Sequence, residues 1–146
     1  MVSGPAPQKA EALAKLEVIA DTYLSMNAPI QHAIPALLAE RRKIQQQLMQ
    51  RVRNNLTVLD SCLAEQNLCH RLAVEGGWYA VLRVPVTASD EELAIALLQQ
   101  VGVLVQPGHF YDFAGDGHLV ISLITRPDEF EEGVKRLLKV IRTITS

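Results

Sequence analysis

Apolar residues recur at helical spacing through most of the first half of the chain. In residues 9–23, and again after Asn27, steps of three and four place apolar side chains on one helix face. Asn27 suits a helix cap, and Pro29 is tolerated in a first turn. Pro35 is expected to interrupt or bend this second helix, so that a longer helix begins near Leu37.

The longer helix is predicted over residues 37–66. One face carries a persistent apolar stripe: Ile44, Leu48, Val52, Leu56, Leu59 and Leu63. At the usual rise per residue such a helix spans roughly 45 Å. A helix of that length in a small domain is expected to pack against more than its own neighbours.

The pattern changes after Asn67, where strand signals begin. Residues 68–74 are compatible with a short strand, and WYAVLRVPV, which starts at Trp78, predicts a strand stopped by Pro85. Ser89, followed three positions later by a glutamate, forms the signature of a capping box at a helix start. Gly102 occupies the position of the glycine that ends such a helix.

Two further strands and a last helix complete the predicted fold. Val103–Val105 predicts a buried strand, LVISLIT from Leu119 predicts another, and a final helix opens around Pro127. The chain is therefore expected to form an α/β (α+β) two-layer sandwich. Its small mixed or antiparallel sheet is covered by helices and preceded by a long helix. Residues 1–8 are expected to be flexible, and residues 9–146 to form one domain, with a helical segment at 9–66 and the sandwich at 67–146.

Composition narrows the functional classes. The chain has 146 residues and a net charge of -2, which argues against a general electrostatic grip on nucleic acid. Cys62 and Cys69 are too few for a disulfide framework and fit a reducing compartment. No apolar run approaches membrane-spanning length, and the first residues contain no signal-peptide core. A cytoplasmic protein without a membrane segment is expected.

A run of basic residues begins at Arg41, and no acidic residue lies between Arg41 and Leu59. It comprises Arg41, Arg42, Lys43, Arg51 and Arg53. A nucleic-acid contact is conceivable, but no aromatic residues are interleaved with the basic ones. A solvated helix face, or a face that meets a partner's acids, is the favoured interpretation.

No standard metal or phosphate motif is present. Cys69 and His70 are adjacent and Cys62 is near, but no second pair completes a zinc pattern. Glycine-rich phosphate loops of either common spacing are lacking. His32 and His118 receive no role, the latter being expected in a turn.

The aromatic residues are concentrated in one stretch. Five of the seven lie between positions 78 and 113, and several follow the Pro107-Gly108 turn directly. Glycine turns beside strands, such as Gly76-Gly77, are common without any ligand, because glycine allows positive φ. Each turn taken singly therefore favours a structural role.

Three linked segments resemble a known family. GGWYAVLRVP, SDEELAIALLQQVGVLVQPGHFYDF and GHLVISLITRPDEFEEGVKRLLKVI are similar, in order and approximate spacing, to the carboxy-terminal (small) domain of class I/II, fold-type I pyridoxal-phosphate (PLP)-dependent aminotransferases. LEVIADTYLSMNAPIQHAIPALL is also similar to the helical segment that follows the cofactor lysine in that family. The likeness runs from about Ala12 to the end of the chain.

The resemblance implies a place for the aromatic loop. In such enzymes the Pro-Gly loop lies at the mouth of the substrate cleft, between the small and large domains. Rigid apolar walls with a few polar groups shape such sites. The expected cleft residues are Pro107, Gly108, Phe110, Tyr111 and Trp78, with His109 as a further candidate. For Trp78 and Phe110 a core position is an equally open alternative.

The resemblance also implies that catalytic machinery is missing. The family holds PLP through a lysine in a Ser-x-x-Lys motif, followed by a Gly-x-Arg-x-Gly phosphate contact. None of the chain's lysines (Lys9, Lys15, Lys43, Lys135 and Lys139) has a serine three residues before it. The chain is therefore expected to be the last third of an aminotransferase, either an excised piece or a shortened reading frame. It is expected to be inactive alone and to bind no PLP covalently, so no catalytic or cofactor-binding residue is assigned.

A second departure concerns the substrate carboxylate. The family places an arginine in a Gly-x-x-Arg-x-Ser frame to clamp that group, and Val120 occupies this position here. Arg126 is the nearest arginine along the chain, but Pro127 makes a strand position for it unfavourable. A surface or helix-cap role for Arg126 is favoured, and the amino-acid specificity is not readable.

Two functions stay open on the sequence. In the first, the chain supplies part of the cleft and of the homodimer contacts of a complete aminotransferase, and its partner is the amino-terminal PLP-binding domain. Such an enzyme transfers an amino group between an amino acid and a 2-oxo acid. In the second, the chain is a stand-alone module whose long helix mediates dimerisation and whose aromatic loop binds a small metabolite. Upstream coding sequence with the lysine motif would discriminate the two.

Overall fold

The computed structural model of the chain describes residues 3–23 and 26–145. Residues 1 and 2 of the stretch expected to be flexible lie outside the described residues. The chain divides into two compact units, Met1–Arg42 and Lys43–Ser146. They are referred to below as the N-terminal unit and the C-terminal unit.

The N-terminal unit consists of helix α1 (Ala6–Thr22) and the first part of helix α2 (Ala28–Ala64). Helix α1 thus begins within the stretch expected to be flexible, and none of its residues is buried. The side chain of Asn27 accepts a hydrogen bond from the backbone N–H of Ile30 at 3.1 Å, which is the cap expected there.

An interruption at Pro35 and a new helix start near Leu37 do not occur, because α2 continues through Pro35 from Ala28 to Ala64. A proline removes one backbone hydrogen bond and crowds the preceding turn. The four residues that follow, Ala-Leu-Leu-Ala, are among the strongest helix formers, and the helix propagates past the defect.

The C-terminal part of α2 belongs to the C-terminal unit and is anchored there by its predicted stripe. Leu59 and Leu63 are buried, whereas Ile44, at the start of the stripe, is exposed. The fully buried Asn55 donates hydrogen bonds from its side-chain nitrogen to the carbonyls of Leu123 (2.9 Å) and Thr125 (2.8 Å). These bonds hold the helix to the chain beyond the sheet.

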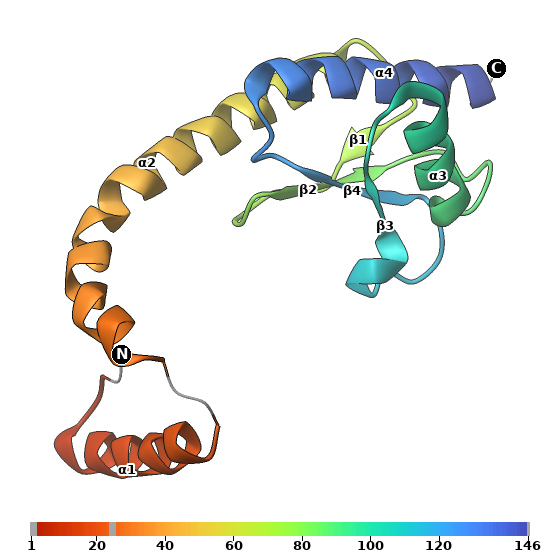
Figure 1. Ribbon diagram of the computed structural model, residues 1–146. Helices are drawn as coiled ribbons and strands as arrows, with labels where there is room; N and C mark the ends of the chain where they lie inside the picture. The colour runs from red at the N-terminus through yellow and green to blue at the C-terminus, as the bar shows by residue number, and fades with distance from the viewer. Residues whose placement is uncertain (1–2, 24–25, 146) are drawn as a thin grey trace. The chain divides into compact units, whose positions relative to one another are not determined.

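The sheet has four antiparallel strands in the order β1-β2-β4-β3 (Figure 1). Their bounds are β1 (His70–Arg71), β2 (Tyr79–Arg83), β3 (Gln106–Pro107) and β4 (His118–Ser122). The small antiparallel sheet and its covering helices agree with the predicted two-layer fold.

Three local strand predictions need correction. The strand expected over residues 68–74 is reduced to two paired residues, and residues 103–105 form no ladder. Pairing on that side is confined to Gln106 and Pro107, because the chain enters the sheet only after leaving the preceding helix through Gly102. His118, expected in a turn, is the first residue of β4 and pairs with Arg83.

The helices of the sandwich end where their sequence signals place them. Helix α3 (Asp90–Val101) begins with the Ser89–Glu92 capping box and ends at Gly102, whose φ of 67° is left-handed. Helix α4 (Pro127–Thr145) packs against α3 and completes the helical layer.

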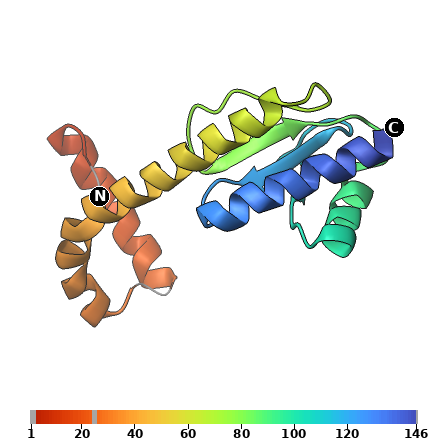
Figure 2. The ribbon, with the colours of Figure 1, turned by 90° about the horizontal axis from the view of Figure 1, so that it is seen from above.

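The core lies on one face of the sheet, between the strands and the helices. Figure 2 shows the last turns of α2 and helix α4 running over the same face. Strand residues alternate between core and opposite face. The core side is formed by Ala80, Leu82, Leu119, Ile121 and Leu123, against Leu59, Leu97, Phe130, Leu137 and Ile141 of the helices.

Candidate functional site

The sheet face opposite the core, the open face, carries polar and aromatic side chains. Because Ala80, Leu82, Leu119 and Ile121 enter the core, their neighbours along the strands must point to the other side. The cross-strand pairs on the open face are Tyr79–Ser122, Val81–Val120 and Arg83–His118.

An aromatic cluster lies at one end of this face. The ring centroids of Trp78 and Tyr79 are 6.1 Å apart, and those of Tyr79 and Tyr111 are 5.8 Å apart in an edge-on arrangement. The hydroxyl of Tyr111 donates to the side-chain oxygen of Gln106. Desolvation, together with the neighbouring Tyr79, raises the pKa of Tyr111, which therefore stays protonated and able to donate.

Trp78 and Phe110 are both on the surface, so neither is a core residue. Trp78 is 49% exposed and Phe110 is 68% exposed. Phe110 packs edge-on against His109 at a centroid distance of 4.8 Å, and no ring contact joins it to the Trp78–Tyr79–Tyr111 cluster among the described residues. The structure thus brings together two of the predicted cleft aromatics, Trp78 and Tyr111, through Tyr79.

Pro107 and Gly108, in contrast, are buried beneath the aromatic loop. Gly108 begins a short 3-10 helix (η1, Gly108–Tyr111), and a Cβ atom there would lie 2.6 Å from the Cβ of His118. The chain can therefore pass this close to β4 only with glycine at the position. The turn serves primarily to bring the aromatic loop against the sheet.

The buried carboxylate of Asp90 holds this turn. Asp90 is 2% exposed, and its Oδ1 accepts from the backbone N–H groups of Gly117 (2.6 Å) and His118 (3.0 Å). Its Oδ2 accepts from the N–H of Gly108 at 3.3 Å. One side chain at the start of α3 thus joins the loop to the beginning of β4.

His118 and Arg83 form a second polar pair on the open face. Arg83 Nη1 lies 2.5 Å from His118 Nε2, and His118 Nδ1 lies 3.3 Å from the carbonyl of Gly115. The same Arg83 nitrogen also lies 3.3 Å from His118 Nδ1. The ring of Phe113 stacks on the imidazole at 4.6 Å. His118 is therefore a buried side chain held between Arg83, Phe113 and the carbonyl of Gly115.

The position at which the family places its carboxylate-binding arginine holds no charged side chain in this chain. Val120 is 3% exposed and lies between Val81 and Gln106 in the sheet. Arg126 lies beyond β4, is exposed, and pairs with Asp128 at 2.9 Å, while its carbonyl accepts from the N–H of Phe130. This residue therefore lies on the surface at the start of α4.

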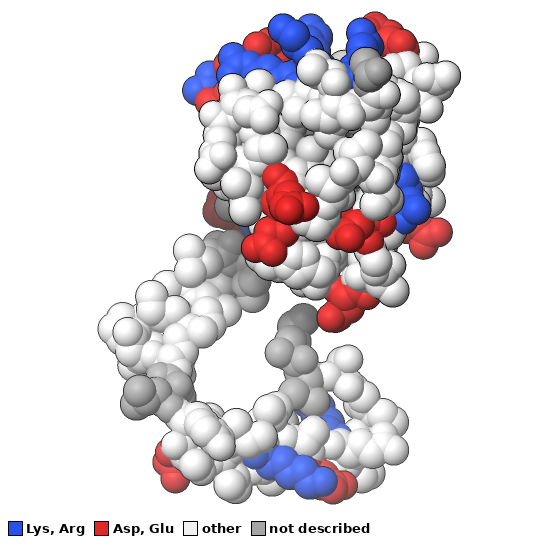
Figure 3. Space-filling model, turned by 90° about the vertical axis from the view of Figure 1, so that its right-hand side faces the viewer, with Lys and Arg blue, Asp and Glu red and all other residues white. Residues whose placement is uncertain are grey.

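Covalent attachment of PLP does not fit the lysines of this chain. All five are exposed on helices; Lys15 pairs with Glu11 at 2.6 Å and Lys135 with Glu131 at 2.5 Å. The bond to Glu131 raises the pKa of Lys135 and favours the ammonium, which cannot attack a carbonyl carbon. Figure 3 shows the Lys and Arg side chains beside acidic ones along the upper edge, where α4 lies.

Asp90, Arg83 and His118 are the residues that sequence reasoning missed. Asp90 follows the capping Ser89, and an acidic residue is common in the first turn of a helix, so its sequence position gives no sign of burial. Its burial depends on two segments far along the chain, which no local pattern reveals. Within the described residues, no three His, Cys, Asp or Glu side chains gather as metal ligands, and no helix is long and apolar enough to cross a membrane.

Comparison with curated proteins shows similarity to aminotransferases. The chain is 33% identical over 63 residues to the LL-diaminopimelate aminotransferase of Oleidesulfovibrio alaskensis, which covers 43% of this chain and 16% of the relative. It is 32% identical over 65 residues to the enzyme of the same name from Dehalococcoides mccartyi, with 44% and 17% covered. The matched region is thus about a sixth of these relatives' length.

Solved structures share the fold. A PLP-dependent aminotransferase from Streptococcus suis has a TM-score of 0.77 at 20% identity, covering 88% of this chain and 34% of its own. The α-aminoadipate aminotransferase LysN from Thermus thermophilus has a TM-score of 0.72 at 22% identity, with 92% and 36% covered. YbdL from Escherichia coli, which has a methionine aminotransferase function, has a TM-score of 0.70 at 23% identity, with 92% and 35% covered. The chain therefore spans about a third of these structures.

The family model for aminotransferases of class I and II matches residues 2–137. The match includes the Gly-Gly-Trp strand, the capped helix α3, the Pro-Gly turn and most of α4. The chain belongs to the class I and II aminotransferase family.

Proposed function

We propose that this chain is the carboxy-terminal small domain of a PLP-dependent aminotransferase and is catalytically incomplete alone. The proposal rests on how much of this chain, and how little of a complete relative, the matches cover. The family match covers residues 2–137, yet this chain spans only 36% of the solved Thermus enzyme. The complete enzyme would transfer an amino group between an amino acid and a 2-oxo acid.

The proposed role of the domain is to wall one side of the substrate cleft. The cluster of Trp78, Tyr79 and Tyr111 supplies apolar surface, and Gln106 and Ser122 add polar groups on the same face. Closure of such a wall over the substrate excludes water. PLP, when bound by the rest of the enzyme, would supply the electron sink for the reaction.

The substrate is not assigned by the relatives. The names of similar proteins refer to LL-diaminopimelate, α-aminoadipate and methionine. Because Val120 removes the family's usual carboxylate partner, the substrate would be oriented by groups outside this chain or by another contact. The proposed partners are the PLP-binding domain of the same enzyme and a second enzyme subunit.

The first test asks whether the chain alone binds PLP covalently. PLP would be added to the purified chain, followed by borohydride reduction and intact mass measurement. We expect no stable adduct at a single lysine and no transaminase activity. A visible absorbance band that disappears in one Lys→Arg variant would contradict the proposal.

The second test restores the missing part. The matched third of Thermus LysN would be replaced by this chain, with LysN truncated at the same junction as the control. We expect the chimera, and not the truncated protein, to bind PLP and to transfer amino groups. A chimera that folds and binds PLP but has no activity with any amino donor would count against the cleft-wall role.

The alternative is a stand-alone ligand-binding or dimerisation module. The observation that favours it is the row of exposed apolar side chains on α1 and the first part of α2: Leu13, Leu16, Ile19, Ile30, Leu37 and Leu38. A surface of this kind marks an interaction site. Sedimentation of the isolated chain discriminates the two functions, because the alternative requires a stable dimer without any other partner.

A further inference from the structure

Arg83, the last residue of β2, is a cation without a carboxylate partner in the described part of the chain. Its side chain is half-buried, and its polar contacts are with the imidazole of His118. Three other arginines of the C-terminal unit are paired with an acid: Arg71 with Asp60, Arg126 with Asp128, and Arg136 with Glu132. A cation that loses part of its hydration without gaining a counter-ion is stabilised when an anion binds to it.

The carboxylates close to this end of the sheet are already used by backbone groups. Both oxygens of Asp90 accept hydrogen bonds, from three backbone N–H groups in total. Asp116 accepts from the backbone N–H of Asp90 at 3.0 Å. Among the described residues neither carboxylate forms an ion pair with Arg83, so the positive charge is available to a ligand.

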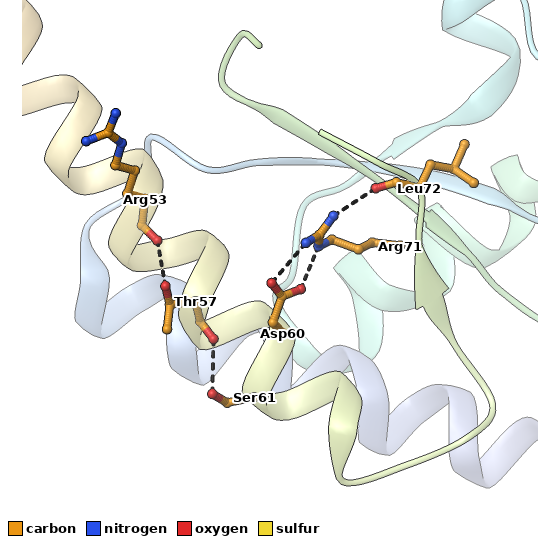
Figure 4. A network of polar contacts seen from close by, with 6 residues as sticks. All are labelled: Arg53, Thr57, Asp60, Ser61, Arg71 and Leu72. Atoms are coloured by element: carbon orange, nitrogen blue, oxygen red, sulfur yellow. Dashed lines mark hydrogen bonds and ion pairs between the residues drawn. The ribbon is translucent and has the colours of Figure 1, made fainter. Parts of the chain in front are cut away.

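The guanidinium of Arg83 has one edge left for an anion. Only Nη1 has a hydrogen-bond partner within the described ranges, and Nε and Nη2 remain. Arg71 shows how this edge binds an acid, since its Nε and Nη2 donate to the two oxygens of Asp60 while Nη1 donates to a backbone carbonyl (Figure 4). A planar carboxylate fits the same two-donor edge on Arg83.

The surroundings confine the Arg83 side chain before any ligand binds. His118, against which it lies, is 8% exposed, and the ring of Phe113 stacks on the imidazole at 4.6 Å. The backbone of Gly117 is also close, because a Cβ atom there would stand 3.8 Å from Arg83 Cζ. A side chain that is already confined loses less conformational entropy when it binds an anion.

Arg83 shares the open face with the aromatic cluster. The cross-strand pair of Val81 and Val120 lies between Arg83 and the pair of Tyr79 and Ser122. Four residues of strand correspond to roughly 13 Å. The face therefore offers aromatic surface, then an apolar strip, then the one residue of β2 and β4 with a permanent positive charge.

We propose that Arg83 binds the side-chain carboxylate of an acidic amino acid or of the corresponding 2-oxo acid. The inference rests on the proposed function, because it takes the open face as a wall of the substrate cleft. The Nε–Nη2 edge donates to both carboxylate oxygens, and the methylene groups of the substrate lie on Val81 and Val120. Arg83 thereby determines specificity, since it favours substrates with a second acidic group over substrates with an apolar end.

The first experiment titrates the full, isotope-labelled chain with glutarate at constant ionic strength and follows the signals by heteronuclear NMR. Glutaramide is the uncharged control ligand. We expect glutarate to shift the Nε signal of Arg83 and the backbone amides of Gly117 and His118, and glutaramide to shift none of them. Absence of these shifts, or equal shifts with the diamide, would overturn the proposal.

Variants make the titration specific. Arg83→Gln is expected to weaken glutarate binding about tenfold or more, because the charged hydrogen bonds to the carboxylate are lost. Arg83→Lys keeps the charge but not the two-donor edge, so its affinity should lie between the two. Arg126→Gln is the matched control, because Arg126 is exposed and already pairs with Asp128. Unchanged binding in the folded Arg83 variants, or an equal loss in Arg126→Gln, would refute the site.

A chimera tests the substrate class. The matched 35% of E. coli YbdL, which has a methionine aminotransferase function, would be replaced by this chain. The acceptors are 2-oxoglutarate and 2-oxopentanoate, in which a methyl group replaces the second carboxylate. We expect Arg83→Gln to lower kcat/KM for 2-oxoglutarate about tenfold more than for 2-oxopentanoate. Arg126→Gln should leave the ratio of the two values unchanged.

The results separate this inference from the proposed function. An active chimera whose acceptor preference does not depend on Arg83 would overturn the inference and leave the domain assignment intact. A chimera that is inactive with every acceptor would count against the proposed function, and the glutarate titration would then decide whether Arg83 is a carboxylate site. Self-association of the free chain that Arg83→Gln abolishes would assign this edge to an acidic group of a second copy and overturn the stated ligand.

Discussion

Gly108 and Asp90 show how single residues position the aromatic loop. Gly108 permits the turn to approach His118, and the carboxylate of Asp90 accepts hydrogen bonds from both sides of that approach. The surface aromatics therefore depend on two residues that a ligand would not touch. Replacement of either should destabilise the loop together with the sheet.

Gly108→Ala is expected to destabilise the chain by about 1–3 kcal/mol, because the added methyl group overpacks a filled site. Gly76→Ala is the matched control, since a Cβ atom there meets nothing within 4 Å and its φ is not left-handed. Urea denaturation followed by Trp78 fluorescence measures both. Equal stability of the two variants would contradict the close-approach argument.

Asp90→Asn is expected to cost about 1–3 kcal/mol, because the amide group turns a buried acceptor into a donor. Either the N–H group of Gly108, or the two N–H groups of Gly117 and His118, then lose their acceptor. Asp112→Asn is the control, as Asp112 is exposed and its left-handed φ of 59° suits asparagine. Thermal unfolding would show whether only the buried substitution matters.

At the scale of elements, an ion pair joins α2 to the first strand. Arg71 of β1 donates to both carboxylate oxygens of Asp60, from Nε at 2.5 Å and from Nη2 at 2.9 Å, and also to the carbonyl of Leu72 (Figure 4). The hydrogen bond from Arg71 lowers the pKa of Asp60 below its ordinary value of 3.8. An arginine that donates to both oxygens of one carboxylate has the most favourable geometry for a partly exposed ion pair.

Asp60→Asn is therefore expected to cost at most about 1 kcal/mol near neutral pH, because solvent screens the pair. The pKa of Asp60 is lower in the folded state, so its stabilisation is present above the unfolded value of 3.8 and is lost as the pH falls through the folded value. The stability difference between wild type and variant should vanish in acid. Glu75→Gln, at an exposed position, is the control, and a constant difference from neutral to acid pH would contradict the pairing.

At the scale of the molecule, the core belongs entirely to the C-terminal unit. Every residue of the buried cluster lies between Leu59 and Ile141, while α1 buries none of its residues. The C-terminal unit therefore contains the apolar burial that stabilises a fold. The N-terminal unit instead presents exposed apolar side chains on its helices.

A fragment of residues 43–146 is thus expected to fold alone, with cooperative unfolding and the near-UV circular dichroism of Trp78 retained. Its melting temperature should lie close to that of the full chain, because the removed residues contribute nothing to the core. A fragment with helical content but no cooperative transition would contradict this independence.

Much of the fold was predictable because its signals are local. The capping box at Ser89, the glycine at Gly102 and the apolar spacing of α4 depend on neighbours within a few residues, and all appear as expected. The motifs in the second half of the chain also indicated the aminotransferase family, and the match to the family model confirms this prediction. The interruption expected at Pro35 does not occur, because the helix propensity of the flanking residues outweighs the loss of one backbone hydrogen bond.

The sequence by itself determined the helices, the two-layer class and the family, since periodicity, caps and motifs are properties of a short stretch. Only the tertiary structure decided that Asp90 is buried under Gly108 and Gly117, that Arg83 pairs with His118, and that residues 103–105 stay off the ladder. These features join segments far apart in the chain. Their energies depend on distances and burial that arise only when the sheet and helices pack together.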